Sequence, residues 1–101
     1  MSISSPLSVE QAEAVARNVQ AVEGVADLNA GRFGEVAMLF PHTRVHGLRS
    51  KADGGVEVHV TIDLNHLGKD TDLRAFAEQI RDVVKSTVDL PADVVLADAT
   101  Y

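Results

Sequence analysis

Cysteine is missing from the 101-residue chain. The chain therefore has no disulfide, no thiolate metal ligand and no cysteine nucleophile. A small domain without such links must fold on its apolar core alone, or with help from a partner subunit. The lack of cysteine also agrees with a reducing compartment.

Basic residues and long apolar runs are also scarce. The chain has 9 Lys and Arg against 15 Asp and Glu, which gives a formal charge of −6. Nucleic-acid binders normally carry a basic patch, so no nucleic-acid partner is expected. No run approaches the ~20 apolar residues that a membrane span needs, and residues 1–6 lack the pattern of a secretory signal. We expect no direct membrane insertion, and any membrane association to pass through a partner protein.

What the chain does contain is enough apolar sequence for one domain. Apolar residues make up 46% of it, and the length suits a single unit. Residues 1–8 are polar and are predicted to be frayed or disordered, and residues 9–101 are predicted to form the domain. Apolar residues recur at helical spacing over 9–22, after a capping-box pattern of Ser8 and Gln11. They do so again from Thr71 or Asp72 to Val88.

Between and after these helices the pattern favours strands. Residues 56–64 alternate between apolar and polar side chains, which predicts a strand with one buried face. Asp53-Gly54-Gly55 before it is a hairpin signal. The other predicted strands are 25–28, 36–40, 44–51 with a bulge at Gly47, and 93–99, and residues 65–70 are predicted to be a polar loop.

This order predicts an α+β fold of helix, three to four mostly antiparallel strands, helix and strand. Both helices are expected to pack on one face of a single sheet, because each has one apolar stripe. In the last strand, apolar side chains fall on both sides, Val94 and Leu96 on one and Val95 and Ala97 on the other. That pattern indicates an edge or face covered by another subunit, so a homo-oligomer is expected.

No catalytic, cofactor-binding or metal-binding residue emerges from the sequence, so we do not expect an enzyme. The four histidines show no convergent ligand set of the kind zinc needs, and the carboxylates are too dispersed for acid–base work on one bond. Surfaces that could bind a partner are better supported. They are the outward face of the alternating strand and an exposed turn, and their residues are Arg32, Phe33, Glu57, His59, Thr61 and Asp63.

An alternative is a KH-like module that binds nucleic acid or a small ligand. Gly31-Arg32-Phe33-Gly34 matches the Gly-x-x-Gly loop of that module, but it lies between predicted strands rather than helices, where a hairpin turn is expected. A partial basic stripe on the second helix would supply the charge of such a surface. The stripe consists of Arg74, Arg81 and Lys85.

Three stretches of the chain resemble the alkaline shock protein family of general stress proteins, in a short actinobacterial-type form. The first is 22–28, a helix end followed by a Glu-Gly-Val step into a strand, and the second is the Val-rich alternating strand 56–64. The third combines the helix segment 76–84 with the closing strand segment 94–98. The resemblance covers most of residues 9–99.

The resemblance implies a cytoplasmic, non-enzymatic protein of the cell-envelope stress response. Members of that family are held near the membrane by a separate anchor protein, and some self-assemble. We therefore expect a scaffold that binds copies of itself and a membrane-anchored protein. The family has no catalytic residues to transfer to this chain.

Overall fold

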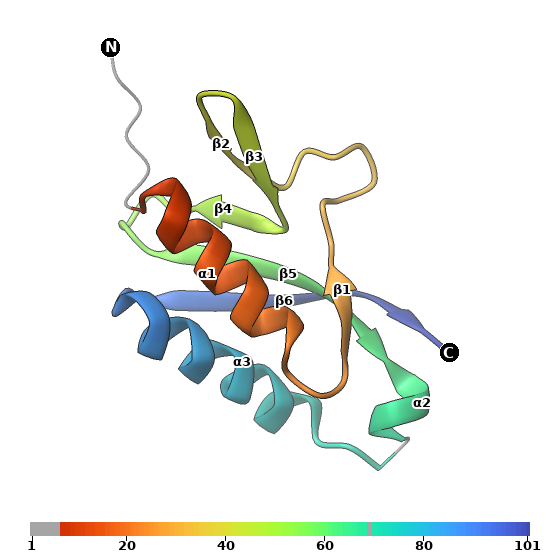
Figure 1. Ribbon diagram of the computed structural model, residues 1–101. Helices are drawn as coiled ribbons and strands as arrows, with labels where there is room; N and C mark the ends of the chain where they lie inside the picture. The colour runs from red at the N-terminus through yellow and green to blue at the C-terminus, as the bar shows by residue number, and fades with distance from the viewer. Residues whose placement is uncertain (1–6, 69) are drawn as a thin grey trace.

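The computed structural model describes residues 7–68 and 70–101. Its elements are α1 (Val9–Gln20), β1 (Val25–Leu28), β2 (Ala37–Phe40), β3 (Thr43–His46), β4 (Leu48–Ser50), β5 (Val56–Asp63), α2 (Leu64–Leu67), α3 (Leu73–Val88) and β6 (Ala92–Thr100) (Figure 1). The fold is α+β, and the predicted order of helices and strands is confirmed.

Strand β5 is the centre of the main sheet. On one edge, β4 pairs antiparallel with residues 56–58 of β5, and β1 pairs antiparallel with residues 60–62. On the other edge, β6 runs parallel to β5 along its whole length. Strands β4 and β1 thus lie end to end on the same edge, because a residue of β5 has only one neighbour on each side. The junction between them falls at His59.

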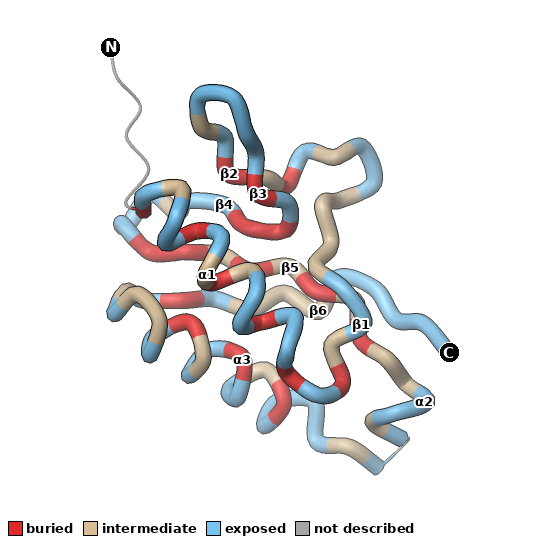
Figure 2. Tube along the Cα trace, viewed as in Figure 1, coloured by how far each residue is buried: buried red, intermediate tan, exposed pale blue. Residues whose placement is uncertain are grey.

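The core lies between β5 and the two long helices. Val56, Val58 and Val60 are 0% exposed, as are Val15 of α1 and Ile80 of α3, and all belong to one hydrophobic cluster. Figure 2 shows the buried positions of α1, α3 and β5 facing one another. Both helices cover the same face of the sheet, as the one-sided apolar stripes predict. Within the described residues, the opposite face of the sheet carries no helix (Figure 1).

The prediction of a single sheet is wrong in one respect. Strands β2 and β3 pair with each other and form a separate two-stranded sheet, here called the ribbon (37–40 and 43–46). The predicted strand 44–51 divides into β3 and β4 because Gly47 takes a positive φ of 84°, which turns the chain out of the sheet plane. The hairpin turn predicted at residues 31–34 is also wrong, because β1 pairs with β5 and not with β2.

Two predicted irregular segments contain ordered structure. Of the frayed segment predicted over 1–8, residues 1–6 lie outside the described residues, and Leu7 is 4% exposed and belongs to the core. Ser8 forms the predicted capping box with Gln11. The polar loop predicted over 65–70 includes most of α2. The N-cap of this helix is Asp63, whose side chain accepts hydrogen bonds from two backbone N–H groups. That cap supplies the helix start that periodicity alone missed.

Strand β6 forms an edge of the main sheet. Among the strands that the structure describes, β6 pairs with β5 alone, and its Val94, Val95 and Leu96 are half-buried. Its register with β5 shifts near Ala97, since Val60 faces Leu96 and Thr61 faces Asp98. Such a bulge twists an edge strand and weakens its ability to pair further.

Candidate functional site

The uncovered face of the main sheet carries half-buried polar side chains. Along β5 the odd positions Glu57, His59 and Thr61 are half-buried, while the even positions between them are buried against the helices. This alternation places the three predicted residues on one face, away from α1 and α3. Asp63, the fourth residue of β5 that was predicted to bind a partner, instead caps α2. Its carboxylate accepts hydrogen bonds from the Asn65 and His66 N–H groups.

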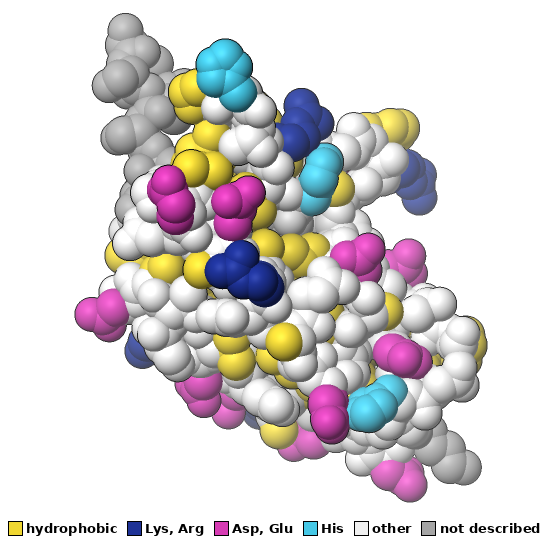
Figure 3. Space-filling view, viewed as in Figure 1, with side chains coloured by type: hydrophobic (Ala, Val, Ile, Leu, Met, Phe, Trp, Pro, Cys, Tyr) yellow, Lys and Arg dark blue, Asp and Glu magenta, His cyan; other side chains and the backbone are white. Residues whose placement is uncertain are grey.

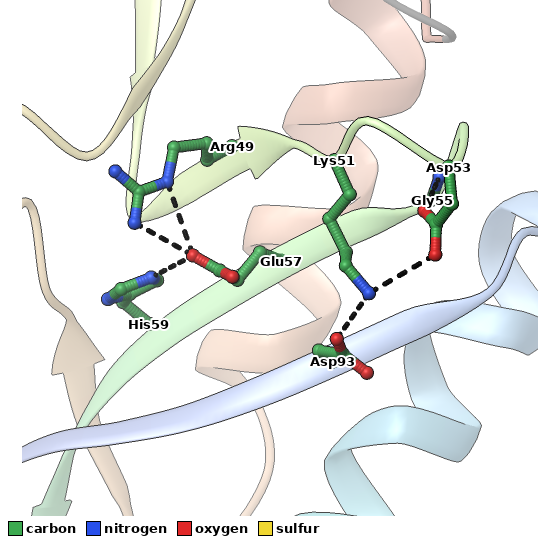
Figure 4. Close-up of polar contacts among 7 residues, drawn as sticks. All are labelled: Arg49, Lys51, Asp53, Gly55, Glu57, His59 and Asp93. Carbon is green, nitrogen blue, oxygen red and sulfur yellow. Dashed lines mark hydrogen bonds and ion pairs between the residues drawn. The ribbon is translucent and has the colours of Figure 1, made fainter.

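Glu57 is the centre of a cluster of charges on this face (Figure 4). Its Oε1 atom accepts hydrogen bonds from Arg49 Nη2 at 2.8 Å and Arg49 Nε at 3.2 Å, and lies 2.7 Å from His59 Nε2. Hydrogen bonding from His59, and then from Arg49, holds the pKa of Glu57 below its ordinary value of 4.5. Glu57 therefore stays ionised near neutral pH and acts as a hydrogen-bond acceptor rather than a proton donor.

A second charged group ties the β4–β5 hairpin to β6 (Figure 4). The Lys51 ammonium forms ion pairs with Asp93 of β6 and with Asp53 of the hairpin turn. The hydrogen bond to Asp93 is the main reason that the pKa of Lys51 is raised above its ordinary value. Asp53 also accepts a hydrogen bond from the Gly55 N–H group, at 2.9 Å. These contacts are structural, since they join three strands at one end of the sheet.

The loop that joins β1 to the ribbon (29–36) is fastened to β5 by Asn29. The Asn29 N–H group donates to the His59 carbonyl at 2.8 Å, and Asn29 Nδ2 donates to Thr61 Oγ1 at 3.0 Å. Asn29 Oδ1 in turn accepts from the Gly31 N–H group at 2.8 Å. One amide side chain thus fixes where the loop leaves the sheet.

The tip of the same loop is held by Glu35. Its Oε1 atom accepts a hydrogen bond from the Phe33 N–H group at 2.9 Å. The backbone N–H groups of Glu35 itself and of Phe33 are the main reasons that its pKa is lowered. The Phe33 side chain is nevertheless 87% exposed. The loop therefore presents an aromatic side chain to solvent on a backbone that is fixed from both sides.

An open hollow of about 570 Å³ lies between this loop and the sheet. Its walls bring together two of the predicted residues, Arg32 and His59, which are far apart in the sequence. Phe33, Glu57, Thr61 and Asp63 do not line it. The other charged residues that line it are Glu35, Arg49 and Asp98. Charges of both signs balance there, so the hollow suits hydrogen bonding to a polar surface better than capture of a single ion.

Sequence reasoning missed Asn29, Glu35 and Arg49. Arg49 could have been found by counting, because the hairpin turn at residues 51–55 sets Arg49 directly opposite Glu57. Asn29 stands two residues before a glycine, a spacing at which asparagine often bonds the backbone. Glu35 has no comparable local signal, since its partner N–H group becomes available only through the fold of the loop.

The remaining histidines and the basic stripe are dispersed. His42 is at the tip of the ribbon with φ 68°, and His66 of α2 has Nε2 3.5 Å from Glu23 Oε2. Within residues 7–68 and 70–101, no group of three or more His, Asp or Glu side chains is placed to hold a metal ion. The Gly-x-x-Gly segment lies between β1 and β2, as predicted, and not between helices. The three basic residues of the stripe are exposed on α3.

Comparisons of the chain with protein-family models, curated proteins and solved structures found no match. The resemblance to the alkaline shock protein family therefore stays a prediction from the residues. Over the part of the chain that the structure describes, none of the helices has the length and apolar content to span a membrane.

Replacing Glu57 by glutamine is expected to destabilise the fold at neutral pH by about 1 kcal/mol or less, as for other partly exposed ion pairs. Because the folded-state pKa of Glu57 lies below 4.5, its stabilising effect is present above that pH. It is lost as the pH falls from there through the folded-state pKa. Urea unfolding of both proteins should therefore show a difference that shrinks in acid. Glu78→Gln, on exposed helix surface, is the control, and a Glu57 difference that persists unchanged in acid would contradict the assignment.

Proposed function

We propose that this chain is a non-catalytic scaffold of the cell-envelope stress response, which acts in the cytoplasm by binding copies of itself and a membrane-anchored protein. The envelope context and the anchored partner rest on the resemblance of residues 22–28, 56–64, 76–84 and 94–98 to the alkaline shock protein family. The proposal that the protein acts by binding other proteins has independent support from the exposed side chains of the 29–36 loop.

The observation that carries the proposal is that Phe33 and its neighbour Arg32 are both exposed at the tip of the 29–36 loop. Aromatic and arginine side chains are enriched at protein interfaces and among their hot spots. Phe33 is 87% exposed, although a phenylalanine is normally largely buried. Since Asn29 and Glu35 already fix the loop backbone, little further order is lost when a partner binds.

The test measures self-association and membrane-protein binding together. The sedimentation coefficient of the chain should rise with its concentration. The tagged chain should also retain a transmembrane protein from a cross-linked, detergent-extracted membrane fraction of the source cells. Phe33→Ala should weaken at least one of these contacts, whereas Tyr101→Ala should spare both, although Tyr101 is also 87% exposed. A chain that stays monomeric at every concentration and retains no membrane protein would overturn the proposal.

A further inference from the structure

A groove lies on the helix side of the molecule, between α1 and the ribbon. Its volume is about 560 Å³, and apolar side chains of Ala16, Leu28 and Val45 contribute to its lining. Figure 3 shows hydrophobic side chains in this area with charged side chains around them. The volume lies within the range of pockets that take up a ligand group or a side chain. A phenylalanine ring is small enough to enter it.

The rim of the groove carries separated charges. Glu13 of α1 and Asp27 of β1 line it together, and Arg44 and His46 of the ribbon also line it. Glu13, Asp27 and Arg44 are all exposed and form no ion pair within the described residues. The acidic pair can therefore attract a basic side chain that arrives from outside, close to the apolar floor.

The tip of the 29–36 loop has the complementary character. Phe33 supplies an apolar ring, and Arg32 beside it is exposed and forms no ion pair within the described part of the chain. The only acidic residue of the loop, Glu35, has its carboxylate on the Phe33 N–H group. The tip thus offers one positive charge next to one exposed aromatic ring. The groove offers an apolar floor with two carboxylates and one arginine, Arg44, on its rim, so its net charge is negative.

The loop and the groove are neighbours in each molecule. Leu28 and Ala30 line the groove, and Arg32 follows two residues later. When the loop and its receptor lie side by side, two copies related by a twofold axis can each place a loop in the partner's groove. Such an interface is closed and self-complementary, as in most homodimers.

We propose that this chain forms a twofold homodimer in which Phe33 of each copy enters the α1–ribbon groove of the other, with Arg32 pairing with Glu13 and Asp27. The proposal deepens the self-association proposed above and rests on it. The partner is a second copy because the chain itself carries both complementary surfaces. Phe33→Ala should weaken the dimer about thirtyfold or more, as for a buried interface anchor.

A charge exchange between copies tests the pairing. Arg32→Glu and Glu13→Arg should each weaken self-association, because each homodimer would then place like charges together at both contacts. An equal mixture of the two variants should form a heterodimer, since the Glu introduced at position 32 meets the Arg introduced at position 13 in one contact. The other contact keeps the native Arg32–Glu13 pair. Sedimentation velocity with one variant fluorescently labelled would measure this, and circular dichroism would confirm that both variants fold.

The outcomes separate the two proposals. If the mixture associates and neither variant does so by itself, the groove is supported as the receptor of the loop. If the wild-type chain associates and both single variants associate equally well, self-association stands but the groove is wrong. If both variants are monomeric and the mixture is monomeric too, the predicted pairing is wrong. A wild-type chain that is monomeric throughout overturns both the dimer and the self-association on which it rests.

Discussion

Leu48→Ala is expected to lower the free energy of unfolding by about 2–5 kcal/mol. Leu48 of β4 is 0% exposed and is among the largest fully buried side chains. It lies opposite Val58 on β5 and belongs to the hydrophobic core, so its removal leaves a cavity in the close-packed core beneath the sheet. A domain of this size is stable by only about 5–15 kcal/mol. Urea unfolding followed by circular dichroism would measure the change.

The matched control is Leu39→Ala, the same chemical change on the ribbon. Leu39 is 68% exposed, so its loss should change the free energy of unfolding by no more than about 0.5 kcal/mol. Equal effects at the two positions would show that Leu48 does not occupy the core position described above.

The elements that could be predicted are those whose pattern is local. Strand β5 alternates between apolar and polar residues from 56 to 63, and the structure buries every second one. The apolar stripe of α3 likewise predicts Phe76, Ile80 and Val84, which are all buried. In both cases the residues that pack together are two to four positions apart, so the chain itself carries the signal.

The arrangement of the strands could be predicted only in part, because pairing partners are distant in sequence. Strand β6 is parallel to β5 because α3 carries the chain back between them, which is the usual way to join parallel neighbours. Nothing in residues 36–46 distinguishes a strand of the main sheet from one of a separate ribbon. That difference arises at Gly47, where the predicted bulge is instead the corner between two sheets.

The candidate site, too, could be predicted where its pattern is local and not where it depends on distant residues. The outward position of Glu57, His59 and Thr61 followed from the period of the strand. The position of Arg32 on the same hollow as His59 did not, since it requires the loop to fold back over the sheet, where Asn29 and Glu35 hold it. Residues that position a loop in this way carry no regular spacing, so single-sequence reasoning tends to miss them.

Gly47→Ala is expected to destabilise the fold by about 2–5 kcal/mol, from a left-handed backbone and an overpacked contact together. Gly47 has φ 84°, and a methyl group there would lie 2.6 Å from Leu28 Cβ and 3.2 Å from the His59 carbonyl oxygen. This is the junction where β1 and β4 meet on β5, and where the Gly47 carbonyl accepts a hydrogen bond from the His59 N–H group at 2.8 Å. Thermal and urea unfolding would report the loss of stability.

Gly34→Ala isolates the contribution of the backbone. Gly34 has φ 75°, but a methyl group there would meet nothing within 4 Å. The substitution should therefore cost only the strain of the left-handed backbone, about 1–2 kcal/mol. The excess at Gly47 therefore measures how closely β1, β4 and β5 approach one another. Because Asn29 N also lies 3.3 Å from the added carbon, Gly47→Ala should in addition displace the 29–36 loop and weaken any contact made through Phe33. Equal destabilisation by the two substitutions would mean that the junction is loose, and that the loop is not positioned from it.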